Sequence, residues 1–154
     1  MTTTSQVPAF VRLGNMLTRT MLRAGFKVAG PNKVPMYLLT VRGRKSGQPR
    51  TTPIVVIEQD RKRYLLAPFG EVDWVRNLRA AGEATLTRGR RTEAIRAIEL
   101  PRGEASLVLK RGLADNSIPS FLVKYFEISA KSSPEELHEA AARHPVFLLQ
   151  SSHA

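Results

Sequence analysis

The sequence predicts a small β-barrel with peripheral helices, folded as a single domain. Six short runs rich in apolar and β-branched residues are joined mostly by hairpin-like connections, a pattern typical of closed β architectures and not of a doubly wound sheet. The 154 residues fit one domain, and no repeat, low-complexity tract or linker divides them. We therefore expect a flexible leader over residues 1–7 and one folded domain over residues 8–154.

A helix is expected before the first strand. From Pro8 to Ala24 the apolar residues recur at helical spacing, with proline suited to the first turn and Gly25 suited to the stop. Its polar face is basic, since it carries Arg12, Arg19 and Arg23. Two interpretations stay open: this amphipathic segment, residues 8–25, either caps the core or makes a peripheral contact with an anionic membrane.

The next segments predict three strands and a helix. The strands are expected over Met36–Val41, Thr51–Glu58 and Arg61–Ala67, the last entered through a tight turn at Gln59-Asp60. Pro53 lies inside the second run, which indicates an edge position or a bulge because proline cannot donate to a sheet ladder. Helical spacing over Val72–Ala81 predicts a helix that ends at Gly82.

The rest of the chain predicts a hairpin, two helices and a last strand. Gly89-Arg90 is the expected turn of the hairpin, a short helix follows Pro101 as far as Leu113, and Ser133 with Glu136 forms a capping box. The run Ile118–Ile128 is ambiguous between strand and helix. The other expected elements are strands Glu83–Arg88, Arg91–Leu100 and Val146–Leu149, and a helix from Ser133 to about Arg143.

The charge of the chain is strongly positive and unevenly placed. Twenty-four basic against 13 acidic residues give a formal net charge of +11, and nine basic residues precede the first carboxylate, Glu58. Such a field attracts nucleic acid, an acidic membrane surface or a polyanionic small ligand. Because Tyr37, Tyr64 and Trp74 are not interleaved with the basic cluster as stacking platforms, no nucleic-acid partner is expected.

The residue types exclude several kinds of chemistry. Without cysteine the chain has no disulfide, thiolate nucleophile or cysteine metal site, and His138, His144 and His153 lack partners at metal-ligand spacing, so no metal is expected. No Gly-x-Ser-x-Gly elbow is present either. If the protein is an enzyme, a cofactor should supply the reactivity. No apolar run can span a bilayer and no signal peptide is recognisable, which predicts a cytoplasmic protein, with membrane association through residues 8–25 as an option.

The best candidate site is the polar segment from Arg42 to Arg50. Gly43 and Gly47 let the backbone turn sharply and approach a ligand closely. Basic side chains and the hydroxyl of Ser46 supply the donors that a phosphate cradle requires. The alternative is a solvated basic turn.

Four stretches carry a resemblance to a known family. The run from Tyr37 to Pro53, which contains Gly-Arg-Lys-Ser-Gly-Gln-Pro-Arg, resembles the signature of the deazaflavin-dependent nitroreductase family. Tyr64–Gly70, Asp73–Ala80 and the closing His144–Phe147 are similar to further family segments in the same order. Members of this family, common in actinobacteria, are split β-barrels of the FMN-binding type that use coenzyme F420.

The resemblance implies a role for each part of the site. The phosphate and acidic tail of the coenzyme, which is a polyanion with a phosphodiester and glutamate carboxylates, would be held by Arg44, Lys45, Ser46 and Arg50. The deazaflavin would lie against the strand backbone of Thr51, Thr52, Pro53, Ile54 and Val55, and beside Ala67, Pro68, Phe69 and Gly70. The same pocket would be closed by Asp73, Trp74, Val75, Arg76 and Asn77.

Two features bear on activity. Many members have Ala-Ser-x-Gly-Gly where this chain has Ala67-Pro68-Phe69-Gly70-Glu71, so Pro68 removes a hydroxyl and an N–H, and Glu71 places a negative charge near an anionic ligand. Phe121 and Tyr125 stand where family members keep aromatic residues over the deazaflavin. On a helix they share one face, and the Tyr125 hydroxyl is the candidate donor to the reacting group of a substrate, with core packing as the alternative.

The expected function is that of an F420-dependent oxidoreductase, which transfers a hydride from the reduced deazaflavin to a quinone, enone or nitro compound. An FMN-binding relative is the alternative enzyme, and a non-catalytic carrier of lipids or hydrophobic ligands at the membrane surface is the alternative from another class. The expected partner is a small hydrophobic substrate, and the chain is expected to be a monomer or a homodimer.

Overall fold

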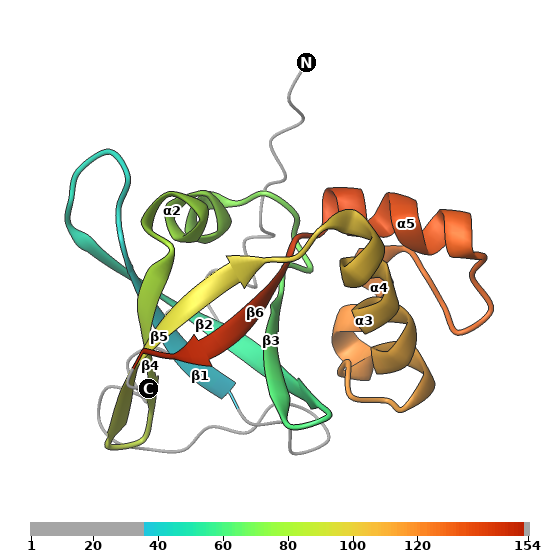
Figure 1. Ribbon diagram of the computed structural model, residues 1–154, viewed down its shortest axis with the longest axis horizontal. Helices are drawn as coiled ribbons and strands as arrows, with labels where there is room; N and C mark the ends of the chain where they lie inside the picture. The colour runs from blue at the N-terminus through green and yellow to red at the C-terminus, as the bar shows by residue number, and fades with distance from the viewer. Residues whose placement is uncertain (1–35, 153–154) are drawn as a thin grey trace.

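Six antiparallel strands close into a barrel in the computed structural model, which describes residues 36–152 (Figure 1). Around the barrel the strand order is β1-β2-β3-β6-β5-β4. The strands are β1 (Met36–Arg42), β2 (Pro49–Gln59), β3 (Lys62–Leu66), β4 (Glu83–Arg88), β5 (Arg91–Glu99) and β6 (Val146–Ser151). The predicted mainly β architecture with peripheral helices is confirmed, and each of the six expected strands is present.

Hairpins fix the register of the barrel. Leu38 faces Pro53 across β1 and β2, and β3 pairs with β2 only from Val56 onward. The missing N–H of Pro53 therefore costs no bond to β3, which agrees with the edge position expected for this proline. The turn into β3 lies one residue later than expected: Asp60 and Arg61 both have positive φ, of 51° and 65°. Two left-handed residues match the right-handed twist of a tight hairpin.

Four helices complete the described part of the chain. They are α2 (Asp73–Ala81), α3 (Arg102–Ala114), α4 (Ser120–Phe126) and α5 (Pro134–Arg143). Gly82 ends α2 in the left-handed conformation, with φ of 72°, and the capping box of α5 is complete because Ser133 and Glu136 bond to each other's backbone N–H. The ambiguous run 118–128 contains the helix α4, whose N-cap is Pro119. The six strands already close the barrel, so no open edge is left where this run could pair as a strand.

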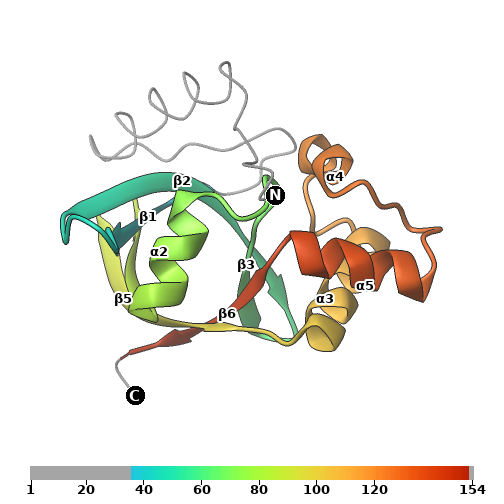
Figure 2. The same ribbon diagram turned by 90° about the horizontal axis from the view of Figure 1, so that it is seen from above.

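The helices divide the core into two parts. Helix α2 lies at one end of the barrel, whereas α3, α4 and α5 gather beside it (Figures 1 and 2). Trp74, Val75 and Leu78 of α2 pack inside the barrel with strand residues such as Leu39 and Phe147. Burial of each such side chain contributes about 1.5–3 kcal/mol. The second cluster joins the three other helices to the outside of β2, β3 and β6.

The sequence predictions for the N-terminal segment fall outside the described residues. They are the leader 1–7, the helix over Pro8–Ala24 and the membrane contact over residues 8–25, so the domain boundary at residue 8 stays a prediction. Within residues 36–152 no helix has the length and apolar character needed to span a membrane.

Candidate functional site

The loop between β1 and β2, residues 43–48, forms a compact polar turn. Its ends are tied by backbone hydrogen bonds: the Gly43 N–H donates to the Gln48 carbonyl at 2.8 Å, and the Gly47 N–H donates to the Gly43 carbonyl at 2.9 Å. Gly47 takes a positive φ of 73°. A Cβ on Gly43 would lie 2.9 Å from the Ser46 Oγ and 3.1 Å from the Gln48 oxygen, so this close turn requires glycine.

Asn77 of α2 holds this loop in place. Its Oδ1 is buried and accepts two bonds from Arg44, one from the backbone N–H at 3.1 Å and one from the guanidinium at 2.7 Å. The same guanidinium lies 3.5 Å from the exposed carboxylate of Asp73, a pair worth at most about 1 kcal/mol. In this structure Arg44 is thus bound to α2 through Asn77 and lies near Asp73.

A polar cavity of about 390 Å³ lies between the loop and the N-terminal half of α2. Within residues 36–152, the charged ends of Lys45 and Arg50 have no hydrogen-bond or ion-pair partner. The Ser46 Oγ accepts the Gln48 N–H at 3.2 Å, which leaves its own hydrogen to donate. Two cations and a hydroxyl beside one cavity are the donor set that a phosphate or carboxylate ligand requires.

An apolar cavity of about 270 Å³ adjoins the polar one. Thr52 and Trp74 line both cavities, so the two share a wall. Its other walls come from β2, from the end of β3 with the segment that follows it, and from α4; Lys124 is the one charged side chain among the described lining residues. The polar cavity thus suits an anionic group and the apolar cavity beside it suits an uncharged one.

The structure brings most of the predicted site residues to these two cavities. The polar cavity is lined by Arg44, Lys45, Ser46, Arg50, Thr51, Thr52, Asp73, Trp74 and Asn77. The apolar cavity is lined by Thr52, Pro53, Ile54, Val55, Pro68, Phe69 and Trp74, together with Phe121 and Tyr125. Ala67, Gly70, Val75 and Arg76 line neither, because the first three are buried in the fold and Arg76 is on another face of α2.

Sequence reasoning missed several wall residues of the apolar cavity. They are Met36, Leu66, Val72, Pro119, Leu122 and Lys124. Apolar side chains of this kind look like ordinary core residues in a sequence. If the run is helical, Leu122 lies next to the face that carries Phe121 and Tyr125. This spacing is the one feature of the sequence that could have indicated Leu122 as a wall residue.

Glu71, which was expected to place a negative charge near the ligand, lines neither cavity. Its carboxylate does not face either cavity, because it accepts a hydrogen bond from Arg79 at 3.0 Å, and Arg79 also binds Glu99 at 2.7 Å. These two carboxylates raise the pKa of the Arg79 guanidinium. The charge of Glu71 is therefore partly offset by Arg79.

His144 links the wall of the apolar cavity to the helices. Its buried imidazole Nδ1 lies 2.8 Å from the Ala67 carbonyl, at the start of the segment that carries Pro68 and Phe69, and its ring lies 4.9 Å from that of Phe126. Burial lowers the pKa of His144 below its ordinary 6.5, and the bond to the Ala67 carbonyl opposes this. Within residues 36–152 no cluster of three or more potential ligands could hold a metal ion.

The depressed pKa of His144 predicts a pH-dependent stability. Below pH 6.5 the unfolded chain gains a proton that the buried ring resists, so the free energy of unfolding should fall as the pH drops from 6.5 through the lower folded-state pKa. Denaturant titrations between pH 5 and 8 measure this slope (about the range in which histidine titrates). His144→Asn should flatten it, whereas the matched change at the exposed His138 should not. Equal slopes for wild type and His144→Asn would contradict the assignment.

Comparisons with known proteins place the fold among cofactor-binding barrels. A family model described as F420H(2)-dependent quinone reductase matches residues 15–126. The chain is similar to a solved F420-H2 dependent reductase (FDR-A), with 22% identity over 81% of this chain and 98% of that one, at a TM-score of 0.52. A structure described as a domain-swapped dimer has 22% identity over 92% and 97% of the two chains, at a TM-score of 0.54.

More distant structures show the same barrel. A putative pyridoxamine 5'-phosphate oxidase from Listeria innocua has 10% identity over 90% of this chain and 93% of that chain, at a TM-score of 0.50. This likeness supports the split-barrel fold that the sequence resemblance implied. Among curated proteins, none is similar enough in sequence to match the chain.

Proposed function

The chain belongs to the F420H(2)-dependent quinone reductase family, so coenzyme F420 is its cofactor and reduction its chemistry, and we propose that its substrates are small hydrophobic quinones, enones or nitro compounds. Assembly as a homodimer is part of the same proposal, because one structural neighbour is described as a dimer. The cytoplasmic location expected from the sequence also remains a proposal.

One observation carries the proposal: a cationic cavity and an apolar cavity share the wall formed by Thr52 and Trp74. Coenzyme F420 has an anionic end and a flat ring system. The basic side chains of the polar cavity suit the anionic end, and the apolar cavity suits the ring system. We assign Lys45, Ser46 and Arg50 to the phosphate and acidic end, with Arg44 holding the loop in position. The strand segment from Thr52 to Val55 and the side chain of Phe69 are assigned to the ring.

When bound, the reduced deazaflavin supplies a hydride to an electron-poor acceptor. The protein itself holds the anionic end of the coenzyme, keeps water out of the apolar cavity and orients the acceptor. Pro68 offers no N–H at the ring side, so the segment 67–70 contacts a ligand mainly through apolar surface. This favours a hydrophobic acceptor.

The acceptor side of the cavity is aromatic. The rings of Phe69 and Tyr125 meet edge to face with centroids 4.8 Å apart, and the Lys124 ammonium lies 5.1 Å from the Tyr125 centroid. Tyr125 is partly exposed and lines the cavity, whereas its neighbour Phe126 is fully buried. We therefore assign the Tyr125 hydroxyl as the hydrogen-bond donor to the carbonyl or nitro oxygen of the acceptor, where negative charge develops.

Removing that hydroxyl should slow turnover. Tyr125→Phe keeps the ring and its contact with Phe69, so we expect a fall in kcat of about tenfold, equivalent to about 1.4 kcal/mol of barrier. Affinity for the coenzyme and the melting temperature should not change. Steady-state rates with quinone, enone and nitro acceptors measure the effect, and unchanged rates with every acceptor would leave Tyr125 as a packing residue.

Two assays test the proposed function. Parallel titrations with oxidised F420 and FMN should give binding of F420 in the micromolar range and weaker binding of FMN, because FMN lacks the acidic tail. A panel of quinones, enones and nitro compounds with reduced F420 then identifies the acceptor class. Micromolar binding of neither coenzyme would favour the carrier interpretation instead.

A further inference from the structure

The turn that carries Phe69 is held from behind by a side chain outside the apolar cavity. From Ala67 to Gly70 the chain makes a turn that presents Pro68 and Phe69 to this cavity. The Gly70 N–H closes the turn by donating to the Ala67 carbonyl at 3.1 Å. The same carbonyl lies 2.8 Å from the Nδ1 of His144, and because a carbonyl oxygen only accepts, Nδ1 is the donor. One of the two hydrogen bonds to this carbonyl therefore comes from a distant part of the chain.

The fold fixes the position of this imidazole. Leu66, the last residue of β3, pairs with Val146, the first residue of β6, so the residues just beyond these two strand ends come together. His144 is 7% exposed, and its backbone N–H donates to the Ala140 carbonyl at 2.8 Å where α5 ends. It is not among the described residues that line either site cavity. The side chain is therefore anchored in the core and reaches the turn from there.

His144 is also in contact with the opposite wall of the apolar cavity. Its ring centroid lies 4.9 Å from that of Phe126, which is fully buried on α4. The preceding residue, Tyr125, lines the cavity and meets Phe69 edge to face at 4.8 Å. These contacts form a closed circuit, from His144 to the turn, from Phe69 to Tyr125 through their rings, and from Phe126 back to His144. One side chain thus joins the turn and α4, which are two walls of the cavity.

We propose that His144 is a positioning residue for acceptor selection, which sets the separation of the turn and α4 and so limits the size of the acceptor. This inference rests on the proposed reduction of an acceptor in the apolar cavity. At about 270 Å³ the cavity is small for a ligand pocket, so a small change in the separation of its walls changes which ring systems fit. Without the imidazole, the Ala67 carbonyl keeps only the bond from Gly70, and Phe69 can move away from α4.

Three variants separate the parts of this proposal. His144→Leu removes the donor and keeps an apolar side chain in its place, whereas His144→Asn keeps an N–H close to the position of Nδ1. Phe126→Leu removes the ring contact on α4 and retains an apolar side chain. For wild type and each variant, kcat/KM is measured with reduced F420 and two acceptors, a one-ring and a three-ring quinone. The readout is the ratio of the two values, in which intrinsic differences between the quinones cancel when variants are compared.

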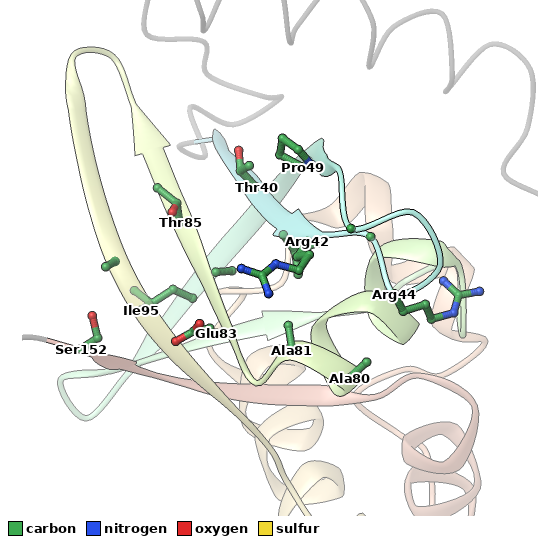
Figure 3. A pocket seen from close by; sticks show the side chains of 15 residues that line it. Thr40, Arg42, Arg44, Pro49, Ala80, Ala81, Glu83, Thr85, Ile95 and Ser152 are labelled. Atoms are coloured by element: carbon green, nitrogen blue, oxygen red, sulfur yellow. The ribbon is translucent and has the colours of Figure 1, made fainter.

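A matched control comes from a separate cavity. This cavity of about 870 Å³ lies between β1, the end of α2, β4 and β5, and it shares no described lining residue with the apolar cavity (Figure 3). Ile95 lines it and is fully buried, so Ile95→Val lowers the stability of the barrel away from the turn and α4. Thermal melts show that each variant is folded, and titration with oxidised F420 gives its coenzyme affinity.

We expect His144→Leu to shift the ratio about tenfold toward the three-ring quinone, since pocket size discriminates acceptors on this scale. Phe126→Leu should shift it in the same direction, His144→Asn should restore it to near the wild-type value, and Ile95→Val should leave it unchanged. An unchanged ratio in His144→Leu, an equal shift in Ile95→Val, or failure of His144→Asn to restore the ratio would overturn the positioning role, while the proposed function would stand. Where His144→Leu does not fold, Phe126→Leu decides by the same criterion. Wild type that reduces neither quinone would overturn the proposed quinone substrate and this inference with it.

Discussion

The double variant Lys45→Ala with Arg50→Ala should lose about 2–6 kcal/mol of its free energy of binding to coenzyme F420. Each side chain supplies a charge-assisted hydrogen bond worth roughly 1–3 kcal/mol, and the two act on different oxygens of the ligand. Both charged ends are without a partner among the described residues and border the polar cavity, so they are available to an anion.

The same variant should be nearly as stable as wild type. Both residues are exposed, and surface substitutions usually change the free energy of unfolding by less than about 0.5 kcal/mol. Fluorescence titration with oxidised F420 and a thermal melt measure the two quantities. The double variant Lys62→Ala with Arg90→Ala is the matched control, because it removes equal charge from positions that line neither site cavity. Wild-type affinity in the Lys45 and Arg50 variant would show that the cradle assignment is wrong.

Much of the fold could be predicted because its signals are local. The capping box at Ser133 and Glu136 and the glycine at position 82 involve residues within one turn of each other, and both ends of these helices are where the sequence placed them. Hairpin turns are similarly local, although the turn before β3 uses Asp60 and Arg61 because two consecutive left-handed residues are needed there. The run containing α4 stayed ambiguous, since its apolar residues suit either type of element.

The site could be predicted in part. The proposed phosphate cradle, residues 43–50, is contiguous in sequence, so its glycines and cations were enough to predict an anion site. The hydrogen bonds of Arg44 could not be predicted in this way, because its partner Asn77 lies 33 residues later and comes close only when α2 covers the end of the barrel. The pairing of Glu71 and Glu99 with Arg79 depends equally on the fold, so the sequence did not reveal it.

Trp74 illustrates why core and site are not alternatives in a protein of this size. Its side chain is 9% exposed and packs at 6.2 Å from the Phe147 ring inside the barrel. The same residue lines both the polar and the apolar cavity. Trp74 therefore belongs to the core and also borders the proposed coenzyme site, and we expect its replacement to affect both stability and binding.

Trp74→Ala should lower the free energy of unfolding by about 3–5 kcal/mol, the range for removal of a large buried aromatic side chain. It should also weaken coenzyme binding, because the wall between the two cavities would be lost. Trp74→Phe retains a ring against Phe147 and should be less destabilised, with an intermediate loss of affinity. Denaturant unfolding and F420 titration, carried out where each variant is folded, separate the two effects.

The neighbouring core residue Val75 provides the control. It is fully buried in the same helix and lines neither cavity, so Val75→Ala should destabilise the protein while coenzyme affinity stays at the wild-type level. If Trp74→Phe binds F420 as tightly as wild type while Trp74→Ala is merely less stable, the indole has a packing role alone. If both Trp74 variants lose affinity and Val75→Ala does not, the loss comes from the shared wall itself, because general loosening of α2 would affect all three variants.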